Sequence, residues 1–172
     1  CLLGGEPIHQ HIGSVGLAFQ HARLQLQRAT VGRDVRAAGA PDDASVDAAL
    51  RSVGLDPASF AERRVDSLSG GEQQMLALGM VFIMKPRLLM IDELSLGLAP
   101  AIVEQLLGIV REISAQGTTI ILVEHNMRLV QAVSDRVLAL TFGKVVTQGP
   151  PAAVLEHPEV IAAYLGENGG AP

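Results

Sequence analysis

The fold of this chain is decided by the stretch Leu68-Ser69-Gly70-Gly71-Glu72-Gln73. A serine and paired glycines stand where a helical pattern begins, so the first amides of that helix lack partners within the helix. Together with the helix dipole, these amides favour an anion, and a glycine lets a phosphate approach the backbone closely. The stretch therefore predicts a phosphate site, although an ordinary serine N-cap explains the same residues.

Further along the chain, an apolar run ends in two adjacent carboxylates, Leu88-Leu89-Met90-Ile91-Asp92-Glu93. The run is apolar on both faces, as is typical of a central strand in a parallel sheet. Folds of the α/β class bind ligands at the carboxyl ends of such strands. Asp92 therefore suits Mg²⁺, which keeps much of its water, and Glu93 suits a water that attacks a phosphoryl group. The alternative is a pair of acids that caps the next helix.

Strand and helix patterns alternate over most of the chain, which indicates an α/β layered fold. Thr30 is expected to cap one short helix and Ser45 to open another, so the middle third indicates an inserted helical subdomain. The expected strands are 88–91, 118–123 (buried), 137–140 and 144–148. The expected helices are 30–38, 45–53, 72–83, 102–113, 127–133 and 160–165.

Composition excludes several classes of function. The chain has 172 residues, of which 48% are hydrophobic, enough for one domain with a core. Its net charge of −5 argues against a nucleic-acid partner, and 3% aromatic residues leave few stacking platforms. Cys1 is the single cysteine, which suits a reducing cytosol. The apolar runs are too short to span a bilayer, no secretory signal is visible, and the first residue is not Met, so we expect a fragment.

In this order and at this spacing, the two stretches resemble the signature motif and the Walker B segment of ABC-transporter ATPase subunits. The resemblance is strongest to the branched-chain amino-acid (Liv-type) importers, although lipopolysaccharide-export ATPases share parts of it. Further runs that carry it are Gly16–Gln20, Leu94–Pro100, Glu124–Met127, Phe142–Lys144 and Ala163–Gly166.

The resemblance implies part of a P-loop NTPase (ABC ATPase) core of the α/β class, with an inserted α-helical subdomain. Residues 1–22 would be a remnant of the core with the Q-loop, and 23–84 the helical subdomain with the signature motif. Residues 85–150 would be the core with Walker B, D-loop and H-loop, and 151–172 a C-terminal helix and tail.

The resemblance also assigns roles for ATP and Mg²⁺. Glu93 would be catalytic, as would His125, which could donate a hydrogen bond to the γ-phosphate; a lone histidine at a strand end is otherwise structural. Asp92 and Gln20 would hold the metal ion. The nucleotide-binding residues would be Gln20, Ser69, Gly70, Gly71 and Glu72.

The implied function is that of an ATP-hydrolysing subunit of an importer for branched-chain amino acids or related small polar substrates. Its partners would be a second ABC ATPase subunit, identical or different, and transmembrane permease subunits, with a substrate-binding protein engaged indirectly. It would lie at the cytoplasmic face of the cell membrane as a peripheral protein. The alternatives are a lipopolysaccharide-export ATPase, a soluble ABC ATPase linked to nucleic acid or ribosomes, and a non-catalytic remnant.

The chain departs from the family pattern in three places. The Walker A loop is expected upstream of residue 1, so we predict that the isolated chain does not hydrolyse ATP. The missing strand is expected beside 88–91, which would leave an apolar edge exposed. Leu94 replaces the usual proline, which predicts a looser turn, and Met80-Val81-Phe82 replaces a usual Arg-Ala-Leu.

Overall fold

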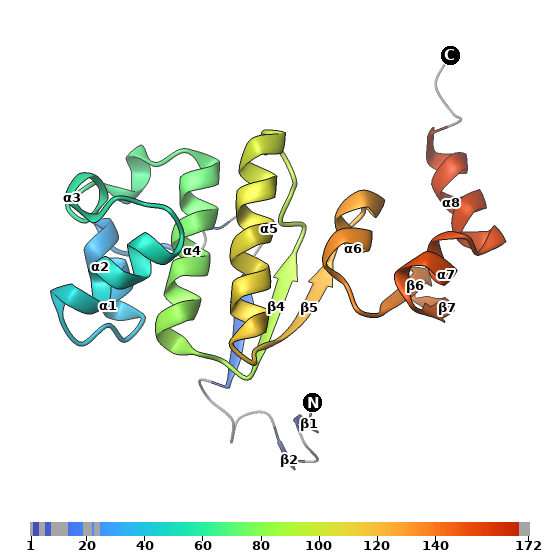
Figure 1. The fold of residues 1–172 in the computed structure, drawn as a ribbon, viewed down its shortest axis with the longest axis horizontal. Helices are drawn as coiled ribbons and strands as arrows, with labels where there is room; N and C mark the ends of the chain where they lie inside the picture. Colours follow the sequence, from blue (N-terminus) through green and yellow to red (C-terminus); the bar gives the residue numbers. More distant parts are fainter. Residues whose placement is uncertain (1, 4–5, 8–13, 19–21, 23–24, 169–172) are drawn as a thin grey trace. The chain divides into compact units, whose positions relative to one another are not determined.

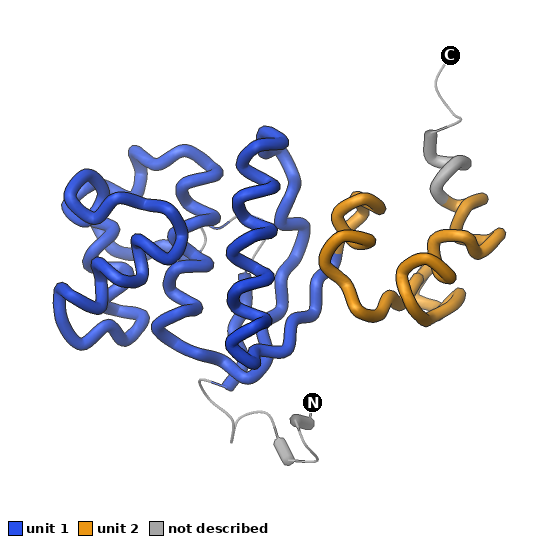
Figure 2. The backbone as a smooth tube through the Cα atoms, in the orientation of Figure 1, with its two compact units in different colours: residues 1–123 blue, residues 124–172 orange. Residues whose placement is uncertain are grey.

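The computed structural model describes residues 2–3, 6–7, 14–18, 22 and 25–168. The chain forms two compact units, Cys1–Val123 and Glu124–Pro172, drawn in blue and orange in Figure 2. Within the described ranges, each helix is either too short or too polar to cross a membrane.

The first unit combines short strands with a parallel sheet and a group of helices (Figure 1). Its strands are β1 (Leu2–Leu3), β2 (Glu6–Pro7), β3 (Val15–Ala18), β4 (Leu88–Asp92) and β5 (Thr119–Val123). Its helices are α1 (Val31–Ala37), α2 (Asp43–Ser52), α3 (Pro57–Phe60), α4 (Gly70–Met84) and α5 (Pro100–Ala115).

Strands β3, β4 and β5 form a parallel sheet in that order, so β4 is central as its sequence predicts. The expectation that a strand outside the chain would lie beside β4 is wrong, because β4 is paired on both sides. The outer edges of the described sheet belong to β3 and β5.

The two faces of this sheet differ in burial. Leu89 and Ile91 are buried in the same hydrophobic core as α4 and α5, which lie side by side against the sheet in Figure 1. On the other face, Leu17, Met90 and Ile121 lie in register and are 47%, 40% and 47% exposed. The prediction that 118–123 is a buried strand is therefore wrong, since its residues are exposed or half-buried and one of its faces lacks a covering layer in the described chain.

The middle third of the chain is helical, as predicted: α1 and α2 pack against α4, and α3 packs against α2. Helix α2 begins at Asp43 rather than at Ser45, because the Asp42 carboxylate accepts the Ser45 amide at 2.8 Å and caps the helix. Thr30 is the N-cap of α1 as expected, but its side chain makes no capping hydrogen bond. The boundaries predicted for the four parts of the chain (1–22, 23–84, 85–150 and 151–172) stay predictions.

The second unit contains α6 (Met127–Val133), β6 (Val137–Thr141), β7 (Lys144–Gly149), α7 (Pro151–Leu155) and α8 (Pro158–Asn168). Strands β6 and β7 pair antiparallel with an irregularity between Ala139 and Leu140. Phe142 and Gly143 connect them with positive φ angles of 46° and 75°. The predicted strand pair and the predicted helix 127–133 are thus confirmed.

Candidate functional site

The turn Ser69–Gly71 lies on the surface at the start of α4, and we call it the signature turn after the motif that it resembles. The Ser69 hydroxyl accepts the Glu72 amide at 3.3 Å, and the Glu72 carboxylate accepts the Ser69 amide at 2.6 Å, which together form a capping box. Ser69 and Gly70 are both exposed. Because the Ser69 oxygen acts as the cap acceptor, its hydroxyl hydrogen can still be donated outward. The serine N-cap interpretation is therefore correct and compatible with an anion site.

The two glycines of the turn have different surroundings. A Cβ on Gly71 would lie 2.9 Å from Cγ2 of Ile102 in α5, so any other residue there would force Ile102 or the turn to shift. A Cβ on Gly70 would meet only Cδ2 of Leu98 at 3.7 Å, an ordinary contact. The sequence argument that both glycines make room for a phosphate thus misses the packing role of Gly71.

The Glu72 carboxylate is held by partners within the chain. Arg63 reaches it with two nitrogens, at 2.9 and 3.4 Å. Burial raises the pKa of Glu72, but the hydrogen bonds from Ser69 and the guanidinium of Arg63 outweigh it, so the pKa lies below its ordinary value of 4.5. Sequence reasoning missed Arg63 because its neighbour Arg64 carries the same charge, and only the fold distinguishes them.

The two acids Asp92 and Glu93, which resemble those of a Walker B segment, lie at the carboxyl end of β4. Asp92 is its last residue and is exposed, opposite Val123 of β5. Glu93 has a positive φ of 47°, and its amide donates to the Val123 carbonyl at 2.9 Å. The following side chain, Leu94, is only 1% exposed. A buried leucine therefore packs this turn onto the core, and the looser turn expected from the missing proline stays a prediction.

Asp92 and Glu93 do not cap the next helix, which was the alternative interpretation, because α5 begins at Pro100 and its N-cap is Ala99. No cluster of three or more His, Cys, Asp or Glu side chains in the described part of the chain is placed to hold a metal ion. Mg²⁺ bound to a nucleotide needs only one or two carboxylates beside water and phosphate oxygens. The exposed carboxylate of Asp92 fits that kind of site.

Two further predicted residues belong to other parts of the chain. His125 belongs to the second unit, where its side chain is 63% exposed and its Nδ1 lies 4.0 Å from the carboxylate of Glu124. The His125 amide donates to the same carboxylate at 3.3 Å. Gln20 lies outside the described residues. The roles of both stay predictions.

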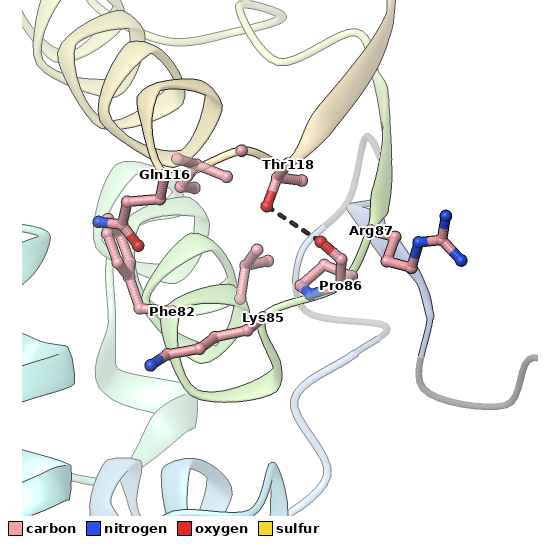
Figure 3. A pocket seen from close by; sticks show the side chains of 9 residues that line it. Phe82, Lys85, Pro86, Arg87, Gln116 and Thr118 are labelled. Carbon is pink, nitrogen blue, oxygen red and sulfur yellow. Dashed lines mark hydrogen bonds between the residues drawn. The ribbon is translucent and has the colours of Figure 1, made fainter.

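A pocket of about 440 Å³ lies at the opposite end of the strands (Figure 3). Thr118, just before β5, donates its hydroxyl to the Pro86 carbonyl at 3.0 Å across it. The side chains of Lys85 and Arg87 are exposed and point in different directions in Figure 3, so they do not converge on one ligand. Because it lies at the amino ends of β4 and β5, this pocket is separate from Asp92.

The parallel sheet has paired acids at its carboxyl edge, where α/β folds bind ligands, and a serine–glycine turn opens α4. Both features fit an ATPase of the P-loop class. The chain belongs to the ABC transporter family, whose model matches residues 3–95. A second model, for branched-chain amino acid ATP-binding cassette transporters, matches residues 144–169.

Similar proteins agree with this membership. The high-affinity branched-chain amino acid transport ATP-binding protein BraG of Pseudomonas aeruginosa is 45% identical over 61% of this chain and 45% of its own length. LivG of Escherichia coli, described in the same words, is 35% identical over 69% of this chain and 46% of its own. The chain thus spans about half the length of these relatives.

Solved structures support the fold. The structure of cbiO1 from Clostridium perfringens, part of the ABC transporter complex cbiONQ, has a TM-score of 0.77 at 27% identity. It is matched over 98% of this chain and 73% of that one. The predicted fold class and the predicted family are therefore confirmed.

Proposed function

We propose that this chain is part of the ATP-binding and ATP-hydrolysing subunit of an ABC importer for branched-chain amino acids or related small polar substrates. Family membership and the printed function of BraG and LivG support this. The observation that carries the proposal is the exposed signature turn, in which Ser69 and Gly70 lie on the surface at the start of α4.

The signature turn would act on an ATP molecule held by a second ABC ATPase subunit. The hydroxyl of Ser69 and the amides of Gly70 and Gly71 would donate to its terminal phosphate, since they are the first donors of a helix. Glu72 would support this contact from within the capping box. Such preorganised donors stabilise charge that develops during phosphoryl transfer.

The acids of β4 would act in hydrolysis once a complete nucleotide site is formed. Mg²⁺ neutralises phosphate charge in such sites, and Asp92 would hold it with the help of Gln20. Glu93 would orient and polarise the attacking water. His125 would donate a hydrogen bond to a γ-phosphate oxygen.

Transport requires partners outside this chain. The subunit would bind transmembrane permease subunits at the cytoplasmic face of the membrane as a peripheral protein. It would be linked through them to a substrate-binding protein. Closure of the paired ATPase subunits around ATP would drive the permease.

A complementation assay tests the proposal. The 172-residue chain is mixed with a cassette of the same family that has a phosphate-binding loop but a serine-to-alanine change in its own signature. We expect no ATP hydrolysis by the chain alone, and hydrolysis in the mixture that is lost with Ser69→Ala. Hydrolysis that is equal with and without the chain would refute the proposed role of the turn.

A further inference from the structure

Arg63 lies behind the signature turn and contacts three groups there. Its Nη1 donates to Glu72 Oε1 at 2.9 Å, and its Nη2 lies 3.4 Å from Glu72 Oε2. The same Nη2 donates to the carbonyl oxygen of Ser67 at 2.9 Å, and Nε lies 3.3 Å from the Ser67 hydroxyl. One guanidinium thus joins Ser67, two residues before Ser69, to Glu72, which closes the capping box.

The guanidinium is itself held in place. The Phe60 ring lies under it, with 4.9 Å between the guanidinium carbon and the ring centroid. The Arg63 amide donates to the Phe60 carbonyl at 2.9 Å, and its carbonyl accepts the Val31 amide at 3.0 Å. The arginine therefore starts from a backbone position fixed on α1 and α3.

These contacts form a chain of hydrogen bonds that ends at the predicted phosphate site. Arg63 orients the Glu72 carboxylate, and that carboxylate accepts the Ser69 amide at 2.6 Å. The Arg63 and Glu72 side chains are 34% and 23% exposed, so solvent competes with the pair only in part. Donors that face a developing charge are effective only when their orientation is fixed beforehand.

We propose that Arg63 is a positioning residue that fixes the orientation of the Ser69–Gly71 donors by clamping Glu72 and the Ser67 carbonyl. This inference rests on the proposed function of the turn. The geometry requires a planar group with several donors, since Glu72 and Ser67 are bound at the same time. A lysine has a single nitrogen and reproduces only part of these contacts.

The neighbouring arginine provides a matched control. Arg64 donates from Nε to Asp66 Oδ1 at 3.0 Å and forms an ion pair with Asp66 Oδ2 at 2.5 Å. Its side chain is 69% exposed, and its hydrogen bonds and its ion pair are made to Asp66. Arg64→Ala removes the same charge from the same segment but leaves the clamp intact.

The functional test uses the complementation assay with the 172-residue chain. With Arg63→Ala we expect kcat to fall about tenfold with little change in KM, because the orientation of transition-state donors is lost rather than nucleotide binding. Arg63→Lys should recover part of the loss, and Arg64→Ala should match the unchanged chain. Equal kcat values for Arg63→Ala and Arg64→Ala would overturn the inference.

Hydrogen exchange gives a second readout that does not depend on catalysis. In the isolated chain, the Ser69 amide should exchange faster in Arg63→Ala than in Arg64→Ala, because its carboxylate acceptor loses its anchor. Arg63→Gln serves the same test if the alanine variant does not fold. If the unchanged chain fails in complementation, the proposed function fails, whereas unaltered Ser69 exchange in both Arg63 variants refutes the clamp alone.

Discussion

Gly71 and Ile102 pack so closely that a Cβ on the glycine would lie 2.9 Å from Cγ2 of the isoleucine. Gly71 belongs to the signature turn, and Ile102 lies in the first turn of α5, which follows the acids Asp92 and Glu93. The signature turn therefore packs directly against the helix that follows the second decisive stretch, within one unit.

Gly71→Ala should destabilise the chain by about 1–3 kcal/mol, because the new methyl group overlaps Ile102. Gly70→Ala should change the free energy of unfolding by less than about 0.5 kcal/mol, since its methyl group meets only Leu98 at an ordinary distance. Urea unfolding measures both. The double variant Gly71→Ala/Ile102→Leu should recover part of the loss, because leucine has no Cγ2 methyl group on its Cβ. Equal stability of the two alanine variants would contradict this packing argument.

Leu94 should matter for stability far more than Leu96, although both lie in the turn after the acids. Leu94 is 1% exposed, so Leu94→Ala should cost about 2–5 kcal/mol through lost burial and a cavity. Leu96 is 46% exposed, and Leu96→Ala should cost less than about 0.5 kcal/mol. Thermal or urea unfolding of Leu94→Ala and Leu96→Ala measures the two losses of stability. A small loss for Leu94→Ala would show that the turn after Glu93 is not anchored by burial.

Lys85→Gly should stabilise the chain. Lys85 ends α4 in the left-handed conformation with φ 44°, which costs a residue with a Cβ roughly 1–2 kcal/mol and glycine little. The greater freedom of glycine in the unfolded chain offsets part of that gain, so we expect about 0.5–1 kcal/mol. Met84→Gly, one residue earlier and helical, should destabilise by a similar amount. If the free energy of unfolding rose in both variants, or fell in both, the left-handed backbone of Lys85 would not explain the effect.

The sequence predicted those parts of the fold that depend on local pattern. The central strand at Leu88–Asp92 has apolar side chains on both faces, and the helix after Ser69 carries its own capping box, so both could be found without coordinates. The sequence predicts that helix α2 begins at Ser45, two residues after its actual start at Asp43. Ser45 and Asp42 are both good N-caps, and only the fold shows that Asp42 is used.

Features that depend on contacts distant in sequence could not be predicted. The burial of Leu94, the contact of Gly71 with Ile102 and the choice of Arg63 over Arg64 all involve packing between elements. The exposure of Ile121 was missed for the same reason, since an apolar strand pattern does not tell whether both faces are covered. The roles of Gln20 and His125 stay predictions.

Acid should weaken the chain in part through Glu72. The folded-state pKa of Glu72 lies below its ordinary value of 4.5, so its contribution to stability is complete above that pH and is lost as the pH falls through the folded pKa. Unfolding free energies of the unchanged chain and of Glu72→Gln, measured from pH 7 to about pH 3, should therefore converge below pH 4.5. Hydrogen bonds from Ser45 and Ser59 also lower the pKa of Asp42 and Asp56, but these carboxyls are present in both proteins. If the two plots of unfolding free energy against pH stayed parallel over the whole range, the ionised carboxylate of Glu72 would not stabilise the fold.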